Sequence, residues 1–160
     1  MKLFLDVEWA DVLASELVSM ALVSLDDRHV FYAERDPLPG DPTPWVKSVV
    51  YPLLDRGSSA ISDSALTRRL REFLAMIPDP CICYESGHDR GLCQFVIDGM
   101  DEADPDGPIV EVRWQRLDDM ASMCERWWKD HPEHRSQRHH ALVDAMALRG
   151  AYFSGWGGLT

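Results

Sequence analysis

KLFLDVE, residues 2–8, ends an otherwise apolar run with two acidic side chains. The apolar residues predict a short buried strand that closes on its acids. Asp6 and Glu8 are two positions apart, so both carboxylates leave the same face of a strand. Two acids on a buried strand are costly unless they are paired or bind a metal. The alternative is a strand end that is simply exposed to solvent.

Two further strands and a hairpin turn are expected next along the chain. Residues 16–25 and 29–34 are apolar runs, and DDR at 26–28 supplies the turn between them. The proline-rich segment 35–44 ends this part of the sheet. The first strand and these two predict a three-stranded meander.

Strand and helix patterns alternate in the rest of the chain. The expected strands cover 78–84, after a turn, and 109–115. The expected helices cover 45–54 up to an interruption at Pro52, 64–77 with Ser62 or Asp63 as the N-cap, 88–100, 117–130, and 139 to about 153, followed by a tail at 155–160. This order predicts one α/β domain over 1–160, with a five-stranded mixed sheet and helices on both faces.

Composition limits the classes of function. No stretch approaches the roughly 18 apolar residues of a membrane span, and no signal peptide is recognisable, so no membrane partner and a cytoplasmic location are expected. The four cysteines form no C-x-x-C pair, which favours reduced, buried thiols. The formal net charge of −11 argues against a broad surface that coats nucleic acid. It still permits an enzyme in which bound divalent cations meet the phosphate.

Two more acidic signals follow the first. Asp89 begins a helix directly after the strand at 78–84, where open α/β sheets place ligands. Its commoner meaning is an acid that complements the helix dipole. HHALVDA, residues 139–145, brings His139, His140 and Asp144 to the start of the last helix. The alternative there is a capped helix with an exposed polar face.

The three signals strengthen one another because of their order. The first strand and the strand at 78–84 are expected to be neighbours, so four carboxylates would converge at one edge. Their repulsion requires cations, and two divalent metals would relieve it. A metal pair stabilises the attacking and leaving oxygens of a phosphodiester displacement, and a histidine can take the proton from the attacking water.

At these residues the sequence resembles the DEDDh 3′–5′ exonucleases of the ribonuclease H-like superfamily, and among them the small bacterial exoribonucleases. FLDVE resembles the first motif, YESGHDRGLCQF the second and HHALVDA the third, over roughly residues 2–150. The resemblance implies a ribonuclease H-like fold and His139 as the general base. It implies these metal ligands: Asp6, Glu8, Asp89 and Asp144.

Helical geometry and the resemblance favour different histidines. Adjacent helical residues point about 100° apart, so His139 and His140 cannot both face the metals. His140 lies four residues before Asp144 and is favoured by helical geometry. The resemblance favours His139, which would reach the site from the chain before the first helical turn. We follow the resemblance.

The resemblance further implies two Mg²⁺ or Mn²⁺ ions, a homodimer and release of nucleoside 5′-monophosphates from single-stranded 3′ ends, RNA rather than DNA. Trp9 is a candidate for stacking on a base, with a core position as the alternative. Arg135 and Arg138 are candidates for steering phosphate from a basic loop, the alternative being a solvated loop. The sequence departs from the family pattern at Trp9, Glu85 and His88, which affects substrate contacts. The rival functions are a DNA-directed exonuclease and a catalytically silent nucleic-acid-binding module.

Overall fold

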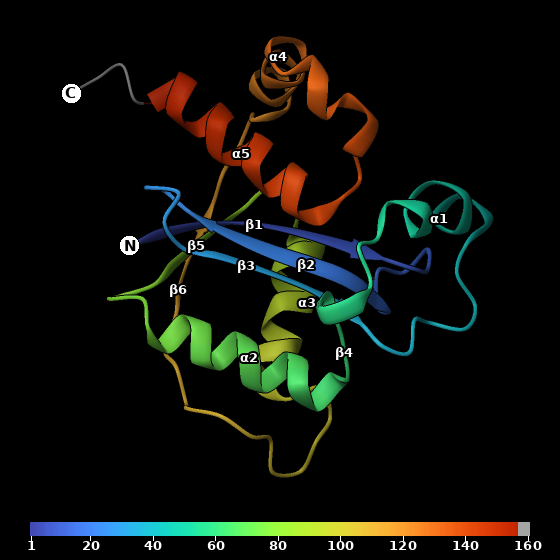
Figure 1. Ribbon diagram of the computed structural model, residues 1–160. Helices are drawn as coiled ribbons and strands as arrows, with labels where there is room; N and C mark the ends of the chain where they lie inside the picture. Colours follow the sequence, from blue (N-terminus) through green and yellow to red (C-terminus); the bar gives the residue numbers. More distant parts are fainter. Residues whose placement is uncertain (157–160) are drawn as a thin grey trace.

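A mixed sheet forms the centre of the protein in the computed structural model, which describes residues 1–156 (Figure 1). Its strands are β1 (Lys2–Trp9), β2 (Leu17–Ser24), β3 (Val30–Arg35), β4 (Ala60–Ile61), β5 (Cys81–Tyr84) and β6 (Arg113–Arg116). They lie in the order β4-β3-β2-β1-β5-β6. β1, β2 and β3 pair antiparallel, whereas β5 is parallel to both β1 and β6, and β4 to β3. The expected mixed sheet is confirmed, and the two-residue β4 adds a sixth strand to the five predicted.

Helices cover both faces of this sheet. They are α1 (Pro44–Val49), α2 (Asp63–Ala75), α3 (Gly87–Asp98), α4 (Ala121–Asp130) and α5 (Ala141–Trp156), with short 3₁₀ turns η1 (Tyr51–Leu53), η2 (Gly57–Ser59) and η3 (Pro132–Gln137). Figure 1 shows α2 and α3 on one side of the sheet and α4 and α5 on the other. The expectation of helices on both faces is therefore confirmed. None of the helices in residues 1–156 has the length and apolar character needed to cross a membrane.

The alternation of β1 divides its side chains between two cores. The residues that pack with α2 and α3 are Leu3, Leu5 and Val7. Phe4 points the other way and packs against Leu148 and Ala151 of α5. Asp6 and Glu8 share the face of Phe4, because every second residue of a strand leaves the same side. Both acids therefore point to the α5 side of the sheet.

Several helix boundaries differ from the sequence-based expectation. The helix expected over 117–130 begins at Ala121, and the helix expected from 139 begins at Ala141. Asp119 has φ +60° and His139 has φ +75°, in the left-handed region that an α-helix cannot contain. The chain becomes helical only after these residues. Of the expected tail, 155–156 belong to α5, and 157–160 lie outside the described residues.

The expected strand over 109–115 and the expected helix over 45–54 are both shorter. Pairing with β5 begins at Arg113, and residues 109–112 form no strand. In the other segment α1 ends at Val49, ahead of the short turn η1 that contains Pro52. Ser62 is the N-cap of α2, and its hydroxyl accepts a hydrogen bond from the Ala65 N–H at 3.4 Å.

The close approach of α4 and α5 depends on Gly150. A Cβ at this position would overlap the Cδ1 and Nε1 atoms of Trp127. We expect Gly150→Ala to push the helices apart and to lower the free energy of unfolding by about 1–3 kcal/mol, measured by urea denaturation. Gly91 in α3 is the matched control, since no described heavy atom beyond its neighbours and the backbone of its own helix lies within 4 Å of its Cβ position. Gly91→Ala should raise stability by about 0.5–1 kcal/mol, and a shift of the same sign in both variants would contradict the packing argument.

Candidate metal centre

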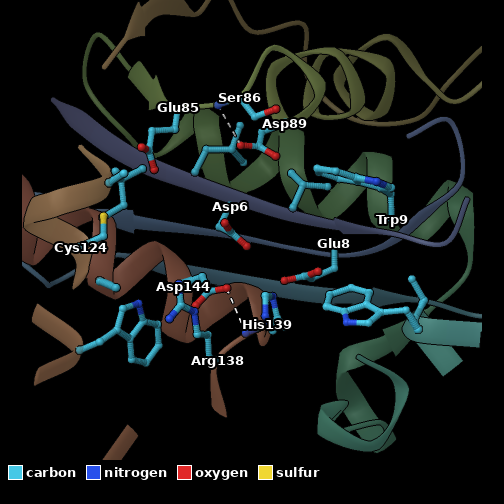
Figure 2. Close-up of a pocket in the computed structure, with 18 of the residues that line it drawn as sticks. Asp6, Glu8, Trp9, Glu85, Ser86, Asp89, Cys124, Arg138, His139 and Asp144 are labelled. Carbon is cyan, nitrogen blue, oxygen red and sulfur yellow. Dashed lines mark hydrogen bonds between the residues drawn. The ribbon is translucent and has the colours of Figure 1, made fainter. Parts of the chain in front are cut away.

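A cleft of about 650 Å³ opens at the end of β1 where the predicted site residues were expected. The four predicted metal ligands and His139 all line it. We call Asp6, Glu8, Asp89 and Asp144 the acid cluster. Figure 2 shows the carboxylates of Asp6 and Glu8 pointing into the space between Asp89 on one side and Asp144 and His139 on the other. Residues from three distant parts of the chain therefore meet in one place.

Strand pairing accounts for this meeting. β1 and β5 run parallel, with Leu3 opposite Ile82, so both strands end at the same edge of the sheet. The chain leaving β5 turns into α3, which begins at Gly87 and carries Asp89 in its first turn. α5 packs across β1 and β2 and brings Asp144 over the same edge. The prediction that β1 and β5 are neighbours is confirmed.

Asp89 has two structural roles. Ser86 is the N-cap of α3, and its hydroxyl accepts a hydrogen bond from the His88 N–H at 3.1 Å. The Asp89 carboxylate accepts one from the Ser86 N–H at 3.3 Å, which completes a capping box. The ordinary helix-start interpretation of Asp89 is therefore correct, and the same carboxylate also faces the cleft.

The structure separates the two histidines. His139 lines the cleft just before α5, and its backbone N–H donates to Asp144 Oδ2 at 3.1 Å. His140 does not line the cleft. It is buried, and its ring stacks on that of Tyr32 with centroids 4.6 Å apart. Its Nε2 lies 3.6 Å from Asp55 Oδ1. His139 is thus the one of the two that lines the cleft, and it does so from non-helical chain.

The acid cluster has few hydrogen-bond donors for its oxygen atoms. The bonds from Ser86 and His139 are the only hydrogen bonds that its carboxylates accept from residues 1–156, and none of the four forms an ion pair there. Asp6 Oδ2 is buried with no partner among the described residues. A buried carboxylate without donors is costly, so these acids are stabilised either by taking up a proton or by a positive charge from outside the protein.

Glu34 shows how this protein treats a buried carboxylate that has a structural role. Glu34 is completely buried, yet it accepts hydrogen bonds from the Tyr32 hydroxyl at 2.7 Å and from the backbone N–H groups of Asp55 and Arg56. Arg56 also lies within ion-pair distance. Every oxygen of Glu34 has a donor, so the shortage of donors is specific to the cleft.

Burial and mutual repulsion raise the pKa values of the acid cluster. Burial raises the pKa of Asp6 well above its usual range, and the neighbouring carboxylates, Asp144 first, raise it further. Burial, followed by the charges of Asp144 and Asp89, raises the pKa of Glu8 to about 9. Burial raises the pKa of Asp89 to about 7 and that of Asp144 to about 6, against the lowering effect of one hydrogen bond each. Crowded carboxylates of this kind are what a bound cation would neutralise.

The donor set fits one or more divalent cations. Glu8, His139 and Asp144 each place a possible ligand atom within 4.8 Å of the others. Asp6 and Asp89 add carboxylates to the same cleft. Mg²⁺ and Mn²⁺ prefer oxygen ligands, which the acid cluster supplies, and a histidine nitrogen is also compatible with Mn²⁺.

The predicted substrate-binding residues occupy different positions. Trp9 and Arg138 both line the cleft. Trp9 follows a β-bulge, because the register between β1 and β2 shifts between Glu8 and Trp9. Arg135 does not line the cleft; it is exposed, and its Nε donates to the Trp128 carbonyl at 3.3 Å. The basic loop thus places one of its two predicted arginines in the cleft.

The sequence did not assign several other cleft residues to the site, among them Trp45, Glu85, Cys124, Glu125 and Trp128. Glu85 had a usable signal, since it follows the buried strand β5 directly, as Asp89 does four residues later. Trp45 had none, because α1 is far from the motifs in sequence. Its ring meets the His139 imidazole edge to face, with centroids 4.9 Å apart.

Comparison with known proteins adds no relative. No protein-family model matches the chain, and no curated protein matches it either. Evidence on function therefore comes from the cleft and from the motif resemblance.

The raised pKa values predict a stability that depends on pH in the metal-free protein. Each acid has a folded-state pKa above its unfolded value of about 4. Its contribution to the free energy of unfolding is therefore complete below about pH 4. The contribution declines as the pH rises through the folded values of about 6 and 7. We expect thermal stability without metal to fall over this window and Mg²⁺ or Mn²⁺ to restore it. If neither cation changes the melting temperature above about pH 7, the cleft does not bind these metals as expected.

Asp6→Asn and Asp11→Asn provide opposite controls. Asp6→Asn removes the most crowded charge, so the metal-free variant should be more stable than the wild type above about pH 7. Asp11 is different: burial raises its pKa, but hydrogen bonds from Glu16, Ser15 and Leu13 together outweigh burial and lower the pKa to about 2. Asp11→Asn should therefore destabilise the protein over the same range. Calorimetry of both variants tests the sign.

Proposed function

We propose that the protein is a metal-dependent 3′–5′ exonuclease with a ribonuclease H-like fold. It acts on single-stranded RNA ends and releases nucleoside 5′-monophosphates. The observation that carries this proposal is the convergence of all three motif-like stretches on one acidic cleft. A sheet that starts with three antiparallel strands and continues with parallel strands and helices supports the fold.

Each residue would contribute a distinct function to hydrolysis. The acid cluster would hold two divalent cations, which stabilise the attacking and leaving oxygens of a phosphodiester displacement. His139 would accept the proton of the attacking water. Burial, followed by the nearby charge of Arg138, lowers its pKa and so favours the neutral imidazole that a base needs.

Two aromatic residues support binding of a terminal nucleotide. Trp9 and Trp45 both line the cleft, and Trp45 is half-exposed. Base stacking on an aromatic ring tolerates any sequence, which suits an enzyme that degrades ends in succession. Exposed Val12 adds apolar surface to the same cleft.

The rival functions differ from this proposal in substrate or in chemistry. A DNA-directed exonuclease would use the same metal centre, and only contacts with a 2′-hydroxyl separate the two substrates. A silent nucleic-acid-binding module has no need for four crowded carboxylates and a neutral histidine, and their presence favours an enzyme. The resemblance also implies a homodimer, which sedimentation velocity would test.

A digest of matched oligonucleotides tests the proposed function. The protein is incubated with 5′-labelled single-stranded RNA or DNA of one sequence, with Mg²⁺ or Mn²⁺. We expect a ladder that shortens from the 3′ end, nucleoside 5′-monophosphates by mass spectrometry, faster turnover of RNA, and no reaction in EDTA. Asp144→Asn should nearly abolish turnover. An intact substrate under all conditions would overturn the proposal.

Replacement of each histidine separates chemistry from packing. His139→Ala is expected to lower turnover by about 10²–10⁴-fold, the usual contribution of a general base. Metal and RNA binding should remain. His140→Ala removes a buried ring on the far side of the chain, so it should lower the melting temperature and change turnover far less. A larger loss of turnover in His140→Ala would show that the wrong histidine has been assigned.

A further inference from the structure

Arg138 is the one Lys or Arg side chain that lines the cleft in the part of the chain described. It lies next to His139, and Figure 2 shows it on the same side of the cleft as Asp144. Its side chain is 49% exposed, so a ligand can reach it. In a protein of net charge −11, this guanidinium is the cleft's own source of attraction for phosphate.

Arg138 is already engaged by a carboxylate. Its Nη2 donates to Glu125 Oε1 at 2.5 Å, and its guanidinium lies over the Trp128 ring at 5.8 Å. Glu125 is on α4 and also lines the cleft. No other hydrogen bond joins Arg138 side-chain nitrogens to residues 1–156, which leaves several of its five donors open.

A phosphodiester could replace Glu125 as the partner of Arg138. Both anions accept the paired N–H groups of a guanidinium, and such bidentate contacts are among the strongest hydrogen bonds in proteins. Glu125 is itself half-exposed, and ion pairs at exposed positions contribute little. The Glu125 carboxylate also adds a negative charge beside the path of an incoming phosphate.

We infer that Glu125 occupies Arg138 in the free protein and competes with the backbone phosphate of single-stranded nucleic acid for it. Glu125 thereby weakens binding and limits the affinity of the cleft. Phosphate displaces Glu125 when an oligonucleotide enters. This inference rests on the proposed function, because it requires nucleic acid as the ligand.

A double-mutant cycle tests the competition. Binding of a 5′-fluorescein-labelled pentanucleotide RNA with a phosphorothioate at its 3′-terminal linkage is measured by anisotropy with Mg²⁺, over a range of NaCl concentrations. Glu125→Gln is expected to lower Kd by about two- to fivefold, the range set by an exposed ion pair. Arg138→Ala is expected to raise Kd by about tenfold. It should also reduce the slope of log Kd against the logarithm of the NaCl concentration by about one, which corresponds to the loss of one phosphate contact.

The double variant decides between competition and simple charge removal. If Glu125 acts through Arg138, then Glu125→Gln has no effect on Kd in the Arg138→Ala background. Asp130→Asn is the matched control, because it removes one exposed acid of the same helix outside the cleft. It should change Kd less than Glu125→Gln does.

The possible failures can be distinguished. Tightening by Glu125→Gln to the same degree with and without Arg138, or no tightening at all, overturns the competition while the proposed function stands. A wild-type protein that binds neither the RNA pentanucleotide nor its DNA counterpart overturns both. A double-mutant cycle with non-additive binding energies supports the inference.

Discussion

Four crowded carboxylates with too few hydrogen-bond donors are the constraint on which the rest of the site depends; Glu8 and Asp89 are buried, and Asp6 and Asp144 are half-buried. The acid cluster has two backbone hydrogen bonds from described residues, and one oxygen of Asp6 has no described partner. Glu34 shows that the same fold can satisfy a buried carboxylate completely. The cleft therefore lacks the donors that would stabilise four ionised carboxylates, so ionisation of the acid cluster is unfavourable unless a cation is bound.

The backbone conformation beside the acid cluster determines which side chains face the cleft. The bulge after Glu8 changes the register of β1 just as the strand enters the cleft, and bulges beside sites reorient side chains. His139 lies in the left-handed region ahead of α5, so its ring faces the acids while that of His140 is buried against Tyr32. The positive φ of His139 thus makes one of two adjacent histidines a cleft residue and the other a core residue.

An acidic protein can bind an acidic polymer only if charge is locally reversed. In this cleft the reversal would come from cations on the acid cluster and from Arg138, which Glu125 partly neutralises in the free protein. Affinity would then depend on metal concentration as well as on contacts between protein and phosphate.

The sequence by itself determined the element order, the shared face of Asp6 and Glu8, and the placement of Asp89 after a buried strand. These follow from local rules: a strand repeats every two residues, and a helix needs a cap. It did not predict β4 or the late starts of α4 and α5, since left-handed residues such as Asp119 leave no clear periodic signal. Nor could it place Trp45 or Glu125 in the cleft. Those positions depend on packing between segments distant along the chain, which only the tertiary structure decides. Local spacing favoured His140 and the motif resemblance favoured His139; the tertiary structure places His139 in the cleft lining and His140 against Tyr32, because the chain's entry into α5 sets the direction of each ring.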